Sequence, residues 1–198
     1  IAASSDTLPD MWYNWCGYNY AEYYAREGLC YDLAQYAQEN NWDEKFIGSA
    51  LDMCKYEEGI YALPQVLTGL VVWYRTDIFE ENGLEVPTTF EELESVCDTL
   101  VEKGIAPFAT GGTSGWHIFR YLEALLEYYA GAEEHDALNA LDADWASSEA
   151  VTNTFAKLKE WSDKGYFNNG FLTEDPNNSK MYVFLSLIHI SEPTRHSL

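Results

Sequence analysis

Aromatic residues near the start of the chain have the side chains most suited to binding chemistry. The 198 residues include 15 Tyr, 7 Trp and 9 Phe. An aromatic ring presents a flat apolar surface to the C–H face of a sugar, and neighbouring polar groups can bind the sugar hydroxyls. Trp15 could stack on such a ligand while the amide of Asn14 binds hydroxyl groups, whereas Trp12 is expected to point into the core. Most other aromatic residues are expected to fill the core or its rim.

A second candidate, Trp116, follows the glycine-rich segment TGGTSG at residues 110–115 and starts an expected helix. Glycine lets the backbone approach a ligand closely, so this segment favours a binding role. The alternative is that Trp116 is a hydrophobic staple of the helix. A phosphate-binding loop is weakly supported, because the segment lacks the Walker lysine and the dinucleotide-binding spacing. His117 is expected to be a surface residue at the helix start.

Patterns that would indicate catalysis are weak. The acidic runs Glu80-Glu81 and Glu91-Glu92-Glu94 could supply paired carboxylates, but acidic side chains at helix starts are explained by the helix dipole and by solvation. The sequence contains no HExxH, GxSxG or Cys/His arrangement in a credible context. We therefore expect a binding protein with no catalytic residue, cofactor or metal. A secreted glycosidase with acidic residues around an aromatic cleft is the alternative.

The four cysteines form no metal-binding pattern, since the sequence has neither CxxC nor a Cys/His pair. Cys97 lies in the middle of an expected helix, on its apolar face, and is predicted to be a buried thiol. Cys16, Cys30 and Cys54 all lie in the first part of the chain, where one disulfide pair is possible and one cysteine would be left over.

The charge narrows the class of ligand. Eleven Lys and Arg residues stand against 33 Asp and Glu residues, for a formal net charge of −22. Such a field repels nucleic acid and anionic substrates, and it suits a neutral or cationic ligand. A high net charge also keeps a protein soluble, and we regard solubility as the larger part of the reason for this charge. No apolar run approaches the length of a membrane span, and the run at residues 70–74 is far too short.

The chain alternates strand and helix signals, which predicts an α/β fold. The turn Glu58-Gly59 precedes a predicted strand at residues 60–63, and residues 70–74 read as a strand buried on both faces. Thr76 opens a short helix that Gly83 ends, and Thr89 and Glu92 form a capping box. Further helices are expected at residues 18–27, 29–39, 43–53, 90–102, 116–130 and from Ser147 or Ser148 to residue 164, with a strand at residues 105–110.

This order of parts resembles extracellular solute-binding protein family 1, the sugar-binding proteins of ABC importers, which includes maltose-binding protein. No single motif is diagnostic, but together the matches cover most of residues 8–184. The matching segments are LPD (8–10), YALP (61–64), WYRTDIF (73–79), PTTFEEL (87–93), KGIAPF (103–108) and LKEWSDKGYFNNGF (158–171).

The resemblance implies a type II periplasmic-binding-protein-like fold, with two α/β lobes joined by a hinge. Residues 1–67 would belong to the N-terminal lobe and residues 68–184 to the C-terminal lobe. Gln65 and Thr68 would then reach the cleft at the crossing, Gly69 would serve the hinge, and Trp116 would cover the sugar. Implied partners are a carbohydrate and the transmembrane permease subunits. A monomer is expected, lipid-anchored on the extracellular face of the membrane or in the periplasm; peptide, polyamine and metal chelate remain alternative ligands.

The two ends of the sequence are expected to be boundaries of a fragment. Residues 185–198 begin with LSLIHISEPTR, which looks like the translation of a sequencing-library adapter, and we exclude them from the fold. The start has no initiator Met, basic segment or apolar signal segment, so we interpret the chain as an internal fragment truncated at both ends.

Overall fold

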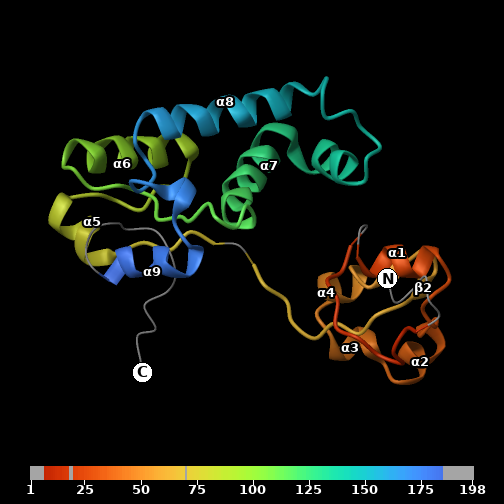
Figure 1. Ribbon diagram of the computed structural model, residues 1–198. Coiled ribbons are helices and arrows are strands. Elements are labelled where there is room, and N and C mark those ends of the chain that lie inside the picture. The colour runs from red at the N-terminus through yellow and green to blue at the C-terminus, as the bar shows by residue number, and fades with distance from the viewer. Residues whose placement is uncertain (1–6, 18–19, 70, 185–198) are drawn as a thin grey trace. The chain divides into compact units, whose positions relative to one another are not determined.

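The computed structural model describes residues 7–17, 20–69 and 71–184 (Figure 1). The adapter interpretation of residues 185–198 lies outside this range. Backbone contacts divide the chain into unit 1, Ile1–Gly69, and unit 2, Leu70–Leu198. Within the described residues, no helix has the length and apolar character that crossing a membrane requires.

Unit 1 packs four short helices against a small antiparallel hairpin. Strand β1 pairs with β2 in the register Lys55↔Ile60 and Tyr56↔Gly59. The main buried cluster of the unit contains Ala37, Trp42, Leu51, Cys54 and Ile60. Its elements are α1 (Ala21–Arg26), α2 (Ala34–Glu39), α3 (Trp42–Lys45), α4 (Gly48–Asp52), β1 (Lys55–Tyr56) and β2 (Gly59–Ile60).

The helices of unit 1 are shorter than the sequence predicted. Residues before α2 bind the hairpin instead of continuing a helix, because Leu33 N donates to Ile60 O at 2.7 Å and Asp32 Oδ1 accepts from Ile60 N at 3.1 Å. The predicted helix 43–53 is split at Phe46, whose backbone is extended (φ −111°, ψ 153°). The hairpin turn falls on Glu57-Glu58, one residue before the predicted turn, because Gly59 already pairs with Tyr56.

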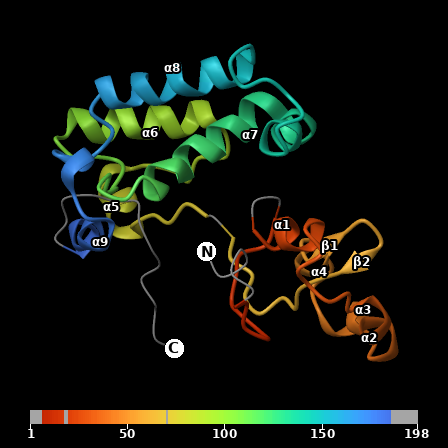
Figure 2. The ribbon, with the colours of Figure 1, turned by 45° about the vertical axis from the view of Figure 1, so that its right-hand side comes forward.

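Unit 2 is mostly helical, and α6 and α8 lie side by side next to α7 in both views (Figures 1 and 2). Its buried core contains Cys97, Phe108, Leu125, Trp161, Tyr166 and Phe167. The elements are α5 (Thr76–Asn82), α6 (Phe90–Glu102), α7 (Trp116–Asn139), α8 (Glu149–Asp163), the 3-10 helix η2 (Phe171–Thr173) and α9 (Pro176–Phe184).

Local signals predicted the helix ends of unit 2 well. The predicted α6 boundaries are confirmed, Gly83 ends α5 in the left-handed conformation (φ 64°), and Ser148 caps α8 through its side chain. The predicted helix at residues 116–130 forms, and a second helical stretch follows it within α7 up to Asn139. Gly131 interrupts α7 with non-helical dihedral angles (φ 67°, ψ 170°).

The prediction that residues 70–74 form a strand buried on both faces is wrong for the described residues 71–74. Val71 and Val72 are 63% and 64% exposed, and no ladder includes this segment. A strand needs a neighbouring backbone to satisfy its N–H and C=O groups, and no described segment pairs with it. The predicted strand at residues 105–110 is likewise reduced to isolated bridge positions at Ala106 and Phe108, and Phe108 pairs in parallel with Phe167.

The Thr89 cap offers a first quantitative test. Thr89 Oγ1 accepts a hydrogen bond from Glu92 N at 3.1 Å, and Glu92 Oε2 in turn accepts from Thr88 N at 2.7 Å. We expect Thr89→Ala to lower the free energy of unfolding of unit 2 by about 1 kcal/mol. Urea unfolding followed by circular dichroism measures this loss. Thr99→Ala in the same helix is the matched control, because the half-buried Thr99 hydroxyl donates only to Ser95 O, which already lies within the helix, and caps no helix end. It should cost clearly less, and an equal loss in both variants would refute the capping role.

Candidate ligand-binding residues

Trp116 lies at the first turn of α7 and presents its ring to solvent. The residue is 54% exposed, and the Arg120 guanidinium carbon stands 4.6 Å from the ring centroid. The His117 ring packs edge-on against Trp116 at a centroid distance of 4.9 Å. Arg120 therefore covers one face of the indole, as cation–π contacts do. Stacking on a flat ligand would use the opposite face.

His117 is a buried residue that fixes the loop before α7, so its predicted surface position is wrong. Its exposure is 9%, and its Nδ1 lies 3.4 Å from Gly111 N and 3.2 Å from Thr110 Oγ1. A backbone N–H can only donate, so Nδ1 accepts from Gly111 and from the Thr110 hydroxyl. The imidazole holds the loop against α7, and no pattern in the sequence signals this role.

The glycines of the loop approach the protein's own backbone. A Cβ at Gly111 would stand 2.5 Å from Pro176 N, and one at Gly112 would stand 2.8 Å from the Leu172 Cα. Gly112 N donates to Phe171 O at 2.6 Å, and Asn168 Oδ1 accepts from Thr110 N at 2.9 Å. The loop that carries Trp116 is thus packed along residues 168–176. From the sequence, these glycines were expected to let the backbone approach a ligand closely. In the structure they let it approach the chain's own backbone.

Because the loop is packed this closely, a single methyl group added at Gly111 should lower the stability of unit 2. Gly111→Ala places a Cβ against backbone atoms, which cannot move aside as a flexible side chain can. We expect the free energy of unfolding of unit 2 to fall by about 1–3 kcal/mol, the usual range for overpacking. Gly115→Ala is the control, because nothing lies within 4 Å of a Cβ there and its φ is −53°. Thermal unfolding of both variants tests this, and equal midpoints would contradict it.

The Asn14–Trp15 loop in unit 1 also exposes an aromatic ring. Trp15 is 67% exposed, and its backbone carbonyl accepts from Ala21 N at 3.1 Å at the start of α1. Asn14 Oδ1 accepts from the backbone N of Trp15 at 3.0 Å. Trp12 is 37% exposed and contacts Tyr24 edge-on at 5.4 Å, so its predicted core position is wrong. Other aromatic residues near Trp15 and Trp116 in the sequence are also exposed, namely Tyr13, Tyr20, Tyr23, Phe119 and Tyr128.

The segment predicted to cross between lobes has no regular secondary structure. Gln65, Thr68 and Gly69 are all exposed, and nothing lies within 4 Å of a Cβ built at Gly69. The polar side chains of Gln65 and Thr68 are accordingly open to solvent. The predicted site residues belong to different units. Unit 1 contains Asn14, Trp15, Gln65, Thr68 and Gly69, and unit 2 contains Trp116.

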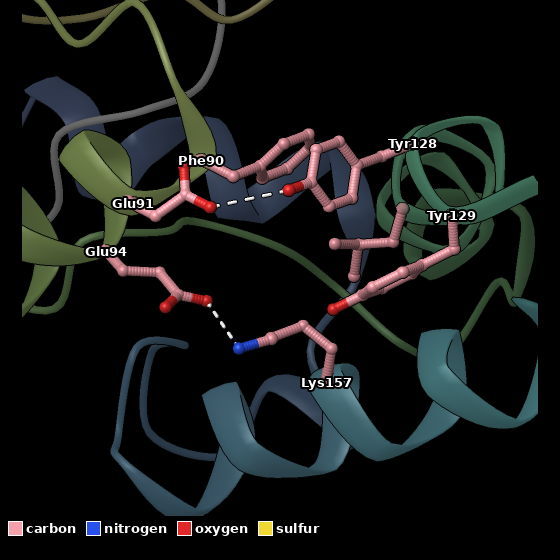
Figure 3. Close-up of a pocket in the computed structure, with 7 residues that line it drawn as sticks. Phe90, Glu91, Glu94, Tyr128, Tyr129 and Lys157 are labelled. Atoms are coloured by element: carbon pink, nitrogen blue, oxygen red, sulfur yellow. Dashed lines mark hydrogen bonds and ion pairs between the residues drawn. The ribbon is translucent and has the colours of Figure 1, made fainter. Parts of the chain in front are cut away.

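A small pocket lies between α6, α7 and α8 (Figure 3). Its volume is about 50 Å³, well below the roughly 300 Å³ of small-molecule sites. Glu94 accepts from Lys157 at 3.0 Å and Tyr128 donates to Glu91 at 3.4 Å across it. Hydrogen bonding to Glu160 and Glu94 raises the Lys157 pKa, so this ammonium group stays charged. Figure 3 shows these two pairs, Tyr128 with Glu91 and Lys157 with Glu94, as dashed lines.

A larger groove of about 590 Å³ lies beside the start of α6. Several of its polar side chains hydrogen-bond within the chain: Thr89 Oγ1 caps α6, Thr88 Oγ1 donates to Glu92, and Glu91 accepts from Tyr128. The rest of the lining is mostly apolar. Its lining is Val72, Tyr74, Phe79, Val86, Pro87, Thr88, Thr89, Phe90, Glu91, Leu93 and Tyr128.

The chain is similar in sequence to known proteins. The family model described as bacterial extracellular solute-binding protein matches residues 1–181. A probable sugar-binding periplasmic protein of Rhizobium meliloti is 32% identical over 161 residues, which is 81% of this chain and 38% of that protein. The alpha-glucosides-binding periplasmic protein AglE of the same organism is 30% identical over 152 residues, 71% of this chain and 30% of AglE. The chain thus spans about a third of the length of these relatives.

The fold agrees with a solved structure as well. A chitin oligosaccharide binding protein superposes with a TM-score of 0.80 over 96% of this chain and 47% of its own, at 21% identity. This match confirms the predicted fold class, although the described residues are more helical than the strand pattern suggested. The matched family and relatives are binding proteins, and the relatives are periplasmic. The match over residues 1–181 shows that the chain belongs to the bacterial extracellular solute-binding protein family.

Proposed function

We propose that this chain serves as the substrate-binding component of an ABC importer and captures a mono- or oligosaccharide. Family membership over residues 1–181 supports the binding role. The observation that carries the choice of carbohydrate is the exposed indole of Trp116, held at a helix start by a rigidly packed loop. An open aromatic face beside polar groups is the surface that a sugar ring needs. Relatives named for alpha-glucosides and for chitin oligosaccharide agree with this ligand class.

In this proposal, residues 1–67 and 68–184 contribute to two lobes that close on the ligand. Trp15 and Trp116 stack on sugar rings, and Asn14, Gln65 and Thr68 bind hydroxyl groups. Gly69 gives the hinge its freedom, and closure presents the loaded protein to the transmembrane permease subunits. The net charge of −22 disfavours anionic solutes and suits a neutral sugar. The protein acts as a monomer without catalysis, either lipid-anchored outside the membrane or in the periplasm.

A thermal-shift screen tests the proposal with the protein as its complete gene encodes it. Each of a panel of mono- and oligosaccharides is added at millimolar concentration, and the melting temperature is recorded. A ligand that binds only the native state stabilises it by about 2.7 kcal/mol at a hundredfold excess over the dissociation constant. We expect one sugar class to raise the melting temperature by several degrees.

Other outcomes of ligand and activity assays would contradict the proposal. A folded protein that shows no shift with any sugar, but a shift with a polyamine or peptide, would overturn the carbohydrate assignment. Release of nitrophenol from chromogenic glycosides would overturn the absence of catalysis. A polyamine would also show binding that weakens strongly with added salt, whereas sugar binding should be nearly independent of salt.

A further inference from the structure

Two cysteines of unit 1 meet in the core although they are far apart in the sequence. Cys16 Sγ lies 3.6 Å from Cys54 Sγ, with a separation of 38 residues along the chain. Cys16 packs against the core cluster that includes Trp42, Cys54 and Ile60. Bonded sulfurs stand about 2.05 Å apart, so a small side-chain rotation would bring this pair to bonding distance. We propose that Cys16 and Cys54 form a disulfide when the protein meets a disulfide oxidant.

The other two cysteines are unsuited to this reaction. Cys97 belongs to unit 2 and has 0% exposure, and burial raises the pKa of its thiol to about 12. Cys30 is half-buried, and among the described residues its sulfur contacts no second sulfur. The structure thus selects one of the three pairings that the sequence left open for Cys16, Cys30 and Cys54.

The two sulfurs differ in access, which sets the order of steps. Cys16 is half-buried, whereas Cys54 is 3% exposed and donates to Ala50 O at 3.4 Å. Burial and the contact with Cys16 raise the pKa of Cys54 to about 12. An external disulfide, such as oxidised glutathione or the disulfide of an oxidoreductase, therefore reacts at Cys16 first. The sulfur–sulfur bond of the reagent breaks as one of its sulfurs joins Cys16 in a mixed disulfide. The other half of the reagent leaves as a thiol.

The second step completes the bond. The Cys54 thiolate attacks the Cys16 sulfur of the mixed disulfide and releases the second reagent thiol. Two protein thiols are oxidised, one reagent disulfide is reduced to two thiols, and the two protons pass to the departing thiolates. Oxidising compartments outside the cytoplasm, where the named relatives of this chain reside, supply such reagents.

The bond would fasten the exposed aromatic loop to α4. Cys16 directly follows Trp15, and Cys54 follows the end of α4 at Asp52. A covalent tie at this point limits the conformations that the Asn14–Trp15 segment can reach, which prepares it for a ligand at lower entropic cost. This consequence rests on the proposed function, whereas formation of the bond does not.

The bond is tested on the 198-residue chain incubated with oxidised glutathione and compared with a sample kept reduced. We expect thiol titration in denaturant to fall from four thiols to two, and peptide mapping without reductant to find Cys16 linked to Cys54. Cys30→Ser should leave the bond intact, whereas Cys16→Ser should leave all three remaining thiols titratable. Four remaining thiols in the native chain, or a linkage through Cys30, would overturn the proposal. Because the mapping uses the unaltered chain, a variant that fails to fold leaves this test intact.

Limited proteolysis separates the bond from its effect on the loop. Chymotrypsin cleaves after aromatic residues, and Trp12, Tyr13 and Trp15 are all exposed. We expect oxidation to slow cleavage within this loop by about tenfold or more, because cleavage requires local opening that the bond opposes. Cleavage at Phe155 in unit 2, which is 54% exposed, should be unchanged and serves as the internal control. Equal cleavage of the loop in oxidised and reduced chains would refute the tether even where the bond forms.

Discussion

Replacing Trp161 by alanine should lower the free energy of unfolding of unit 2 by about 3–5 kcal/mol, the range for removing a large buried aromatic residue. Trp161 is 3% exposed, and its ring centroid lies 5.4 Å from that of Phe108 and 6.1 Å from that of Tyr166. Its Nε1 donates to Glu94 Oε1 at 2.7 Å. Alanine would leave a cavity among α6, α8 and the Phe108–Phe167 bridge, and it would remove a hydrogen bond to a carboxylate.

Two further variants separate packing from hydrogen bonding at this site. Trp161→Phe keeps most of the apolar contact and loses the bond to Glu94, so about 1.5–3 kcal/mol should be lost. Phe155→Ala lies on the same helix but is 54% exposed, so its cost should be small. Urea unfolding, fitted with one transition for each unit, measures all three. The assignment of Trp161 to the core would fail if Trp161→Ala cost no more than Phe155→Ala.

Replacing Trp116 by alanine should weaken binding of the sugar found in the thermal-shift screen by about 30-fold or more, the scale of a binding hot spot. Stability should hardly change, because the indole is 54% exposed and its ring contacts are to His117 and the exposed Arg120. Isothermal titration calorimetry of the complete gene product measures the affinity. A stability loss as large as the affinity loss would show that Trp116 supports the fold and not the ligand.

Matched variants sharpen this test. Trp116→Phe retains an aromatic face and should keep most of the affinity. This result is expected if Trp116 acts by stacking, whereas a role that depended only on the size of the side chain would not require it. Trp15→Ala should also weaken binding, because the proposal gives the loop of unit 1 an equivalent stacking role. Phe155→Ala removes an exposed aromatic from α8 and should leave affinity unchanged. If Phe155→Ala weakened binding as much as Trp116→Ala, a specific stacking site would be refuted.

Helix boundaries were predictable because the groups that set them are close in sequence. Thr89 caps α6 through the N–H of Glu92, Ser148 caps α8 through the N–H of Val151, and Gly83 ends α5 with a positive φ. Each interaction spans a few residues, so residue type and spacing suffice to predict it. The buried position of Cys97 was also predictable, because it follows from the apolar face of one helix.

Long-range contacts decided what the sequence alone left open or predicted wrongly. Residues 71–74 have strand-forming side chains, but a strand also requires a neighbouring backbone, and no described segment supplies one. The role of His117 depends on Gly111 folding back onto its ring, and the glycines themselves face residues 172–176, about 60 positions further along the chain.

By itself, the sequence determined the class of fold, the capped helices of unit 2, the acidic charge and the resemblance to a family of solute-binding proteins, because each is carried by local pattern or composition. Only the tertiary structure decided that Cys16 meets Cys54, that Trp116 and Trp15 are open to solvent, and that Trp161 is enclosed. These outcomes depend on which distant segments pack together. Residue spacing along a chain does not show which distant segments meet, because close packing in the interior depends on many side chains at once.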